Sequence, residues 1–570
     1  MAASPPSEVF AIADRYVERF AALDPISATF AGIAGHDDQM TDFGPDAADE
    51  RAAHDRAVLA DLRRAEIAGE RDRVAVGVMS EALSLAVELH DAGEHLRDLN
   101  VIASPVQAVR QVFDLMSTAT TDDWEAIAAR MALVPQALSS YQAALTEGVR
   151  RELPAARRQV VECVRQAETW SGTGGGNGGA GNGGGFFHGL VDAYDATALD
   201  GRALRDTLAD RARHADSAYA ALARYLVEEY EPTERDAVGA DRYAVRARAF
   251  TGMALDLPDT YAWGWDELHR IEHAMGEVAE RILPGEGVDA VIAHLKSDPT
   301  RAVEGEDALR SWLQDLMDRT IAELDGVHFD IPEPVRTVEA MIAPPGGAAA
   351  MYYTPPSEDF SRPGRTWYPT LGKTRFPLWH EVTTCYHEGV PGHHLQVAQV
   401  LYRAEELTRF QRSLAWSSGH GEGWALYAER LMGELGYLDD PAFELGLLAA
   451  QAMRAMRVVV DIGLHLELAV PNGERAHGGE TWAPELALPF AIAHSKMPED
   501  FMRSEVDRYL GWPGQAISYK VGERVWLAVR AAAQQRLGAR FDLKAFHRHA
   551  LDLGNMGLAQ LESELAAWAP

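Results

Sequence analysis

Apolar residues recur along most of the chain at steps of three and four, which is the period of an α-helix with one buried face. In the stretch ADSAYAALARYLVEEY, Tyr219, Leu222, Leu226 and Tyr230 fall on one such face. The same pattern covers residues near 53–70, 76–97, 122–148, 265–282 and 304–324. The alternation typical of strands is scarce, so the sequence predicts a mostly α-helical protein.

Two segments interrupt this pattern. The run SGTGGGNGGAGNGGGFF predicts a flexible loop at residues 172–185, because glycine loses more conformational freedom on ordering than any other residue. It lacks the Lys-Ser/Thr end of a phosphate-binding loop. Residues 329–356 are punctuated by Pro and Gly, and within them VRTVEAMIA and AAAMYY read as short strands. We therefore expect a small β element near residues 335–353.

The second interruption also suggests a division of the chain. We expect residues 1–328 to form a helical N-terminal region and residues 329–570 to form the region that carries the chemistry. A chain of 570 residues is long for a single compact core. We nevertheless expect the two regions to pack as one continuous unit, in a large multi-helix architecture.

Composition excludes some classes of partner. The net charge of −33 argues against binding to nucleic acid or to anionic membranes through charge. Only two cysteines are present, Cys163 and Cys385, so the sequence predicts neither a disulfide framework nor a cysteine-based zinc module. A reduced, cytoplasmic setting is the expectation. The start of the chain has no secretory-signal pattern, and no apolar run approaches the length of about 18 residues that a spanning helix needs.

The stretch TTCYHEGVPGHHLQ contains the strongest candidate chemistry. Zinc enzymes of the His-Glu-x-x-His type place two ligands one helical turn apart, but here Pro391 stands four residues after His387. At about 1.5 Å per residue, His393 and His394 would lie about 9 and 10.5 Å along an unbroken helix, too far to share one ion with His387. The Pro-Gly pair at 391–392 must break the helix, and a break can bring one of the two histidines back. The spacing leaves open which one, and it also leaves open a histidine-rich helix end that binds no metal.

A third ligand is offered further along the chain. The stretch SSGHGEGWALYAERLM places Glu422 on a predicted helix, 28 residues after His394. Two imidazoles and a carboxylate complete a catalytic zinc site that keeps one position open. His420 is a competing ligand, but it lies just before the helix. Glu429 shares the face of Glu422, and we expect it either to accept a hydrogen bond from a ligand imidazole or to be a solvent-facing charge.

A later helix concentrates charge among apolar residues. The stretch MRAMRVVVDIGLH places Arg454, Arg457, Asp461 and His465 at helical spacings of three and four. These side chains form either an internal ion pair or a wall of an active site.

A Pro-Gly turn then precedes a second polar group. The stretch GWPGQAISYKVGERVW brings Gln515, Tyr519 and Lys520 close together in the sequence. A phenol can donate to a developing oxyanion, and a lysine or glutamine can hold a carboxylate.

Together these motifs resemble a bacterial family labelled domain of unknown function 885. The resemblance is carried by HEGVPGHHLQ, GEGWALYAE, RVVVDIGLH and PGQAISYKVG, and by LDPISATFAGIAGHDD at residues 23–38. That family is regarded as related to the gluzincin metallopeptidases. The resemblance implies an all-α fold with a deep cleft, like that of carboxypeptidase Taq and angiotensin-converting enzyme.

The resemblance also assigns ligands. GEGWALYAE looks like the NEGFASYVE type of helix in zinc aminopeptidases, which gives Glu422 the third-ligand position. PGHHLQ is similar to the Gly-His ending of the zinc helix in the carboxypeptidase Taq type, which makes His393 the second ligand and His394 its neighbour.

The function expected from these observations is zinc-dependent cleavage of peptide bonds in short peptides. His387, His393 and Glu422 are expected to hold Zn²⁺ with a water in the fourth position, while Glu388 acts as the general base and Tyr519 stabilises the oxyanion.

Further residues are expected to support this reaction. A strand at Ala348–Tyr353 is expected to pair with an extended substrate. The residues expected to contact substrate are Ala350, Tyr352, Arg457, Gln515 and Lys520. Those expected to support the ligands from behind are His394, Glu429 and Asp461. Two alternatives remain: a zinc-dependent amidase acting on a small metabolite, and a non-catalytic helical scaffold with a vestigial site.

Overall fold

The computed structural model describes residues 7–174, 184–197, 199, 201–343, 350–474 and 476–569. Most of the loop predicted at residues 172–185 lies outside the described residues, as do the first two residues of the strand predicted at 348–353. Helices account for 67% of the chain and strands for 5%. The prediction of a mostly α-helical protein with a small β element is therefore confirmed.

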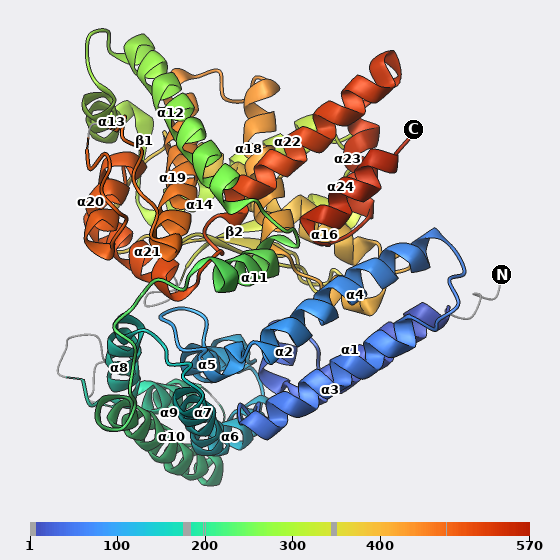
Figure 1. The fold of residues 1–570 in the computed structure, drawn as a ribbon, viewed down its shortest axis with the longest axis vertical. Helices are drawn as coiled ribbons and strands as arrows, with labels where there is room; N and C mark the ends of the chain where they lie inside the picture. The colour runs from blue at the N-terminus through green and yellow to red at the C-terminus, as the bar shows by residue number, and fades with distance from the viewer. Residues whose placement is uncertain are drawn as a thin grey trace. The chain divides into compact units, whose positions relative to one another are not determined.

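The chain forms two compact units (Figure 1). The first unit consists of Met1–Val238 together with Asp507–Trp512, and the second consists of Gly239–Val506 together with Pro513–Pro570. The sequence prediction placed its boundary at residue 328, where the Pro- and Gly-rich segment begins. Residues 239–328 instead belong to the second unit, because α12 (Leu257–Ile282) packs along α19 (Pro441–Leu466).

The first unit is helical wherever the structure describes its regular elements. Its helices are α1 (Glu8–Leu23), α2 (Pro25–Phe30), α3 (Pro45–Leu62), α4 (Glu70–Asp91), η1 (Glu94–Leu96), α5 (Pro105–Gln111), η2 (Val112–Leu115), α6 (Thr121–Ala132), α7 (Val134–Arg150), α8 (Arg157–Ser171), α9 (Phe186–Asp195) and α10 (Arg202–Glu228). The face predicted from Tyr219 to Tyr230 is buried in a core to which Trp124 and Ile127 of α6 also contribute. This unit therefore has an apolar core of its own.

The second unit holds the remaining helices. They are α11 (Ala240–Thr251), α12, α13 (Val288–Ser297), η3 (Pro299–Arg301), α14 (Glu306–Leu324), η4 (Glu333–Arg336), α15 (Glu381–Glu388), α16 (His393–Tyr402), α17 (Arg409–Ser413), α18 (Ser418–Glu434), α19, α20 (Pro484–Ser495), α21 (Glu499–Gly511, its last residues counted with the first unit), α22 (Ser518–Leu537), η5 (Gly538–Arg540), α23 (Leu543–Asp552) and α24 (Leu558–Ala567). Among the described residues, no helix is long and apolar enough to cross a membrane.

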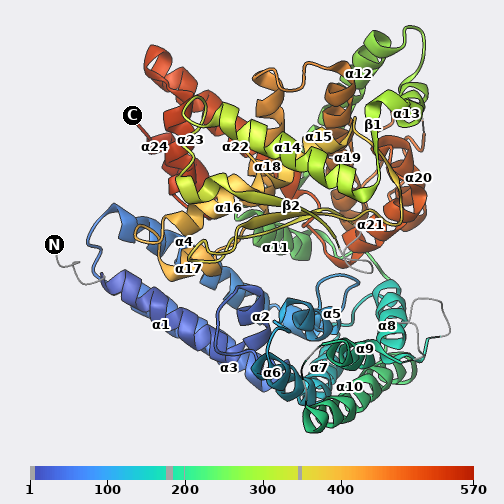
Figure 2. The ribbon, with the colours of Figure 1, turned by 180° about the vertical axis from the view of Figure 1, so that it is seen from behind.

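Two small sheets complete the second unit. A three-stranded sheet has the order β2-β4-β3, formed by β2 (Val338–Ile342), β4 (Gly364–Tyr368) and β3 (Tyr352–Thr354). Strand β4 is parallel to β2 and antiparallel to β3, so β3 is an edge strand. A second pair joins β1 (Ala302–Glu304) to β5 (Arg375–Pro377). Helix α14 packs along β2, as Figure 2 shows.

Helices α18 and α22 approach each other unusually closely. A Cβ at Gly423 would lie 2.5 Å from backbone atoms of Gly522, and a Cβ at Gly522 would lie 2.0 Å from the carbonyl oxygen of Gly419. Two turns beyond Gly522, Arg530 pairs with Glu434 at the end of α18. The two helices therefore run in the same direction, and their first turns lie side by side.

Candidate metal centre

The candidate centre begins where α15 ends. Its last two residues are His387 and Glu388, and the chain then turns through Gly389–Gly392, with a cis peptide bond before Pro391, into α16. The amide of Gly392 donates to the carbonyl of Tyr386 at 3.0 Å, and a Cβ at Gly392 would lie 2.0 Å from the carbonyl oxygen of His387. Only glycine fits this approach. The helix break expected at the Pro-Gly pair is present, and it folds the start of α16 back against the end of α15.

A tryptophan from a third helix holds this break. The indole N–H of Trp424 donates to the carbonyl of Pro391 at 2.9 Å and lies 3.3 Å from that of Gly392. Trp424 is fully buried on α18, two residues after Glu422. The residue that fixes the loop before His393 is therefore rigidly connected to the residue predicted to be the third ligand.

The three side chains predicted to bind metal come together at this point. Glu422 Oε2 lies 3.4 Å from His387 Nε2 and 3.5 Å from His393 Nε2. In a tetrahedral zinc site with bonds of about 2.1 Å, ligand atoms lie about 3.4 Å apart. Glu422 Oε2 is buried without a hydrogen-bond partner among the described residues. The donor set and its spacing therefore fit a zinc ion.

The charge balance among His387, His393 and Glu422, which we call the trio, also fits a bound cation. Burial by itself would lower the pKa of His387, but its contacts with the carboxylates of Glu422 and Glu429 raise the pKa to about 9. Burial would raise the pKa of Glu422, yet its contacts with His387 and His393 hold that pKa far below the usual range. In the protein without a metal, a proton on the imidazole therefore balances the buried carboxylate. A bound cation would take over this role.

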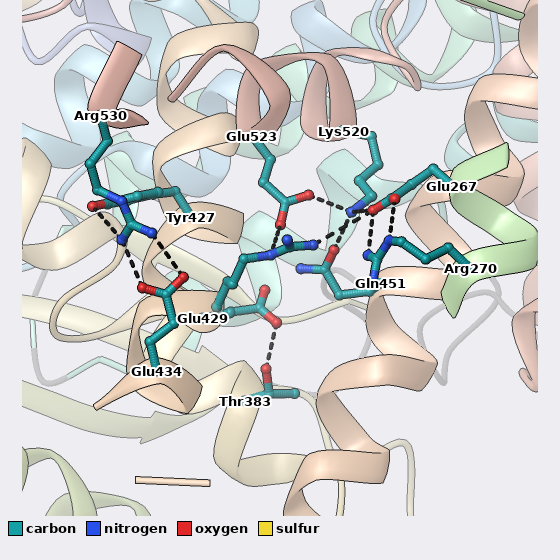
Figure 3. Close-up of polar contacts among 11 residues, drawn as sticks. Glu267, Arg270, Thr383, Tyr427, Glu429, Glu434, Gln451, Lys520, Glu523 and Arg530 are labelled. Carbon is teal, nitrogen blue, oxygen red and sulfur yellow. Dashed lines mark hydrogen bonds and ion pairs between the residues drawn. The ribbon is translucent and has the colours of Figure 1, made fainter. Parts of the chain in front are cut away.

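Glu429 lies behind the first imidazole, as the sequence predicted. Its Oε1 lies 2.7 Å from Nδ1 of His387. In the neutral form that a metal ligand requires, the imidazole would therefore donate from Nδ1 and present an unprotonated Nε2 to Glu422 and His393. The hydroxyl of Thr383 donates to Oε2 of Glu429 (Figure 3). A guanidinium nitrogen of Arg454 lies 3.8 Å from Oε1 of Glu429. Glu429 is fully buried, which excludes the alternative of a solvent-facing charge.

His394, the neighbour of His393, makes different contacts. His394 Nε2 lies 2.8 Å from the carbonyl of Val335, so Nε2 donates and Nδ1 accepts from the hydroxyl of Tyr353 at 3.0 Å. Burial lowers the pKa of His394 to about 4, so the ring is neutral near pH 7. A Cβ at Gly364 would lie 2.6 Å from both His394 Nδ1 and the Tyr353 oxygen. His394 thus joins α16 to the edge strand β3, while His393 lies in the trio.

The predicted base, Glu388, directly follows His387, the first of the three candidate ligands. Glu388 is only 7% exposed. Its position directly after His387, at the helix end, keeps it near the trio without occupying one of the three ligand positions.

Tyr519 lies at the start of α22, one turn before Gly522. Helices α18 and α22 run in the same direction from their close contact at Gly423 and Gly522. Tyr519 therefore lies beside the first turn of α18. The guanidinium of Arg457 lies over its ring at 4.9 Å and also binds Glu505 at 2.7 Å. Tyr519 is partly exposed.

Lys520 does not have the role that the sequence suggested. Its side chain is fully buried, with Nζ 2.5 Å from Gln451, 2.8 Å from Glu267 and in contact with Glu523 (Figure 3). Three partners occupy the three donors of the ammonium group. Lys520 therefore belongs to an internal charge network, and its ammonium group is not available to hold a substrate carboxylate.

Asp461 also differs from its predicted place. It accepts hydrogen bonds from the hydroxyl of Tyr243 at 2.7 Å and from the amide of Gly514 at 2.9 Å. These contacts hold the Pro-Gly turn before α22, so Asp461 supports that turn rather than one of the three candidate ligands. Gln515, in the same turn, is buried.

Two further predicted residues lie at the edge of the sheet. Ala350 is exposed just before β3, and Tyr352 on that strand stacks on Trp367 of β4 at 5.8 Å. The strand begins at Tyr352, later than the sequence suggested.

Two supporting residues were missed in the sequence. Thr383 stands four residues before His387, which places both on one helix face. Trp424 carries an indole N–H that needs an acceptor once buried. Either feature was a usable signal.

Comparison with known proteins gives a family and a fold. The sequence model of a family described as "Bacterial protein of unknown function (DUF885)" matches residues 25–565. Among curated proteins, none matches the chain.

Two solved structures are similar over almost their whole length. A protein of Colwellia psychrerythraea, provisionally described as a lipoprotein, has a TM-score of 0.81 at 22% identity and covers 99% of each chain. A protein of Shewanella oneidensis, provisionally described as a lipoprotein of unknown function, has a TM-score of 0.73 at 17% identity, over 99% of this chain and 100% of that one. At these identities the likeness shows the fold alone.

Proposed function

The chain belongs to the bacterial DUF885 family of unknown function, and we propose that it is a zinc-dependent hydrolase that cleaves peptide bonds in short peptides. The observation that carries this proposal is the spacing of 3.4 and 3.5 Å between the Glu422 oxygen and the nitrogens of His387 and His393. A general base directly after the first ligand adds to it. We further propose a relationship to the gluzincin metallopeptidases, with a substrate cleft.

The residues divide the chemistry among themselves. His387, His393 and Glu422 would hold the ion, which when bound supplies Lewis acidity and lowers the pKa of water towards 7. Glu388 takes a proton from the attacking water and passes it to the leaving amine. Tyr519 donates its hydroxyl hydrogen to the developing oxyanion, a contribution of about 3–4 kcal/mol when such a donor is present.

The edge strand supports a peptide as substrate. Among the residues that the structure describes, strand β3 is paired only with β4, and an extended peptide can add to such an edge through main-chain hydrogen bonds. The Tyr353–His394 hydrogen bond fixes this edge to the helix that begins with His393. Ala350 and Tyr352 are the strand residues that we propose to be near substrate, with Gln515 and Arg457 further away.

The test combines metal analysis with Glu388→Gln. We expect purified protein to contain about one zinc per chain and to release amines from a peptide library. The Glu388→Gln variant should keep its zinc and lose hydrolysis by about a hundredfold or more, because it cannot accept the proton. Glu434→Gln, on the exposed part of α18, is the matched control and should keep both its zinc and its hydrolytic activity.

Other outcomes separate the remaining readings. Cleavage of small acyl amides but of no dipeptide or oligopeptide would indicate an amidase. Full peptidase activity in Glu388→Gln would remove Glu388 as the base. A protein that neither binds zinc nor hydrolyses any substrate would be the helical scaffold with a vestigial site. The expected absence of nucleic-acid and membrane partners and the cytoplasmic setting stay predictions.

A further inference from the structure

A half-exposed tryptophan lies beside the metal centre. Trp416 is 50% exposed in the segment between α17 and α18, although its neighbours Ala415 and Ser417 are buried. The hydroxyl of Ser417 donates to the carbonyl of Phe250 at 3.3 Å. On the other side of Trp416, the amide of Ala415 donates to the carbonyl of Phe410 at 3.0 Å. The backbone on both sides of Trp416 is therefore held, while half of the residue is exposed.

The indole itself is also held in place. A Cβ at Gly421 would lie 2.3 to 3.0 Å from three atoms of the six-membered ring of Trp416, so the ring lies directly on the backbone of α18. Gly421 immediately precedes Glu422. The ring centroid is 6.3 Å from that of His393. One side of the ring thus packs on the backbone next to Glu422 and lies near the His393 ring, while half of the residue remains exposed.

Single exposed apolar residues are common on protein surfaces and need no explanation by themselves. Trp416 differs because a glycine is required beneath it and because it borders the proposed reaction centre. A rigid aromatic surface costs little conformational entropy to bind against, and binding sites typically combine such surfaces with a few polar groups. The polar groups here are the trio and Glu388.

We propose that Trp416 forms the apolar wall of the subsite for the side chain next to the scissile bond. The preferred substrates are then peptides with a large apolar or aromatic residue at that position. This proposal rests on the proposed peptidase function and names its substrate class. The acidic and imidazole groups of the centre handle the peptide bond, while the indole takes apolar surface of the side chain out of water.

The experiment compares peptides that differ only at one residue flanking the cleaved bond: Leu or Phe, Ala, and Arg. In Trp416→Ala, the ratio of kcat/KM for Leu or Phe over Ala peptides should fall about tenfold or more relative to the wild type, as the loss of apolar contact in a pocket implies. Trp416→Phe should keep most of the preference. Tyr402→Ala, which removes a half-exposed aromatic from the end of α16, is the control and should leave the ratio unchanged.

A binding measurement separates recognition from turnover. In the Glu388→Gln background, calorimetry with uncleaved Leu and Ala peptides should show the same loss of preference when Trp416 is replaced, at unchanged zinc content. If Trp416→Ala loses zinc, Trp416→Gln, of closer size, takes its place.

The outcomes distinguish the two proposals. If the wild type cleaves peptides but the Leu-to-Ala ratio is the same in every Trp416 variant, the apolar wall is wrong and the peptidase stands. If replacement lowers only the cleavage of Arg peptides, the indole recognises cations and the apolar assignment is likewise overturned. If the wild type cleaves no peptide, the peptidase function itself fails.

Discussion

Single buried side chains carry most of the chemistry proposed for the trio. Glu429 is the clearest of them, because it binds the imidazole of His387 on the side away from the trio and is itself bound by Thr383. A carboxylate in this position fixes the tautomer of the ligand and increases its basicity.

We predict that Glu429→Gln lowers zinc affinity by about 10- to 100-fold, because a neutral amide replaces the charged acceptor. Competition against a chromogenic chelator measures this affinity. Glu434→Gln on the same helix is the control. Equal affinity in both variants would show that Glu429 does not support the ligand.

A histidine further from the centre makes stability depend on pH. His547 is fully buried, with Nε2 2.6 Å from the hydroxyl of Tyr427 and its ring stacked on Phe329 at 4.8 Å. Burial lowers its pKa to about 3. Below about pH 6.5 the unfolded chain binds a proton at this residue and the folded protein does not, so this contribution to stability is complete above pH 6.5 and is lost as the pH falls towards 3.

We predict that this single residue costs the wild type up to about 2 kcal/mol of unfolding free energy between pH 7 and pH 5. Denaturant unfolding at both pH values should show a smaller difference for His547→Gln. His273→Gln, whose histidine side chain is 81% exposed, provides the comparison. An identical pH dependence in wild type and His547→Gln would contradict the assignment.

For individual residues, the sequence predicted the candidate site where the site depends on the spacing of neighbouring residues. The His-Glu pair and the glutamate of the Gly-Glu-Gly-Trp helix were identifiable because their neighbours in the chain limit what they can do. Lys520 was misjudged, because its partner Glu267 lies about 250 residues earlier and no local pattern shows that the two meet.

The break between α15 and α16 is the element on which the centre depends. It works because Gly392 lets the chain pass against the carbonyl of His387.

We predict that Gly392→Ala separates His393 from His387 and abolishes stoichiometric zinc binding, since its Cβ would lie 2.0 Å from a backbone oxygen. Zinc content and melting temperature measure the effect. Gly276→Ala, inside α12 with open space around the added carbon, is the matched control and should raise stability by about 0.5–1 kcal/mol. Full zinc content in Gly392→Ala would mean that the break tolerates a side chain.

The elements themselves were predictable to different degrees. Long helices such as α12 and α14 follow from their periodicity. Strand β4 was missed because its inward positions are Gly364, Thr366 and Tyr368, which do not produce an alternation of apolar and polar residues. Its pairing with β2 and β3 depends on contacts that a short segment does not encode.

At the scale of the whole molecule, the first unit has an apolar core of its own. The core of the first unit lies within residues 26–230, and all three residues of the trio belong to the second unit. The sequence suggested a boundary at residue 328 because composition changes there. The sequence did not show the observed division, because helix α12 packs against α19, which lies about 200 residues later in the chain.

We predict that Ile127→Ala, which leaves a cavity in the first unit's core, lowers the stability of that unit by about 2–5 kcal/mol and leaves the zinc content of the folded protein unchanged. Calorimetry and metal analysis of the same sample test this. Val227→Ala, at a residue that is 67% exposed, should change neither quantity. Loss of zinc from folded Ile127→Ala would show that the two units are energetically coupled.

The glycine contact between α18 and α22 has a practical consequence for anyone who wishes to alter the protein. Gly419, Gly423 and Gly522 leave no volume for even one methyl group, so mutant libraries that include them will mostly contain damaged proteins. Substitutions are better placed at exposed positions such as Trp416, before α18, and Ala350, beside strand β3. Side chains there can change without moving the backbones of α18 and α22.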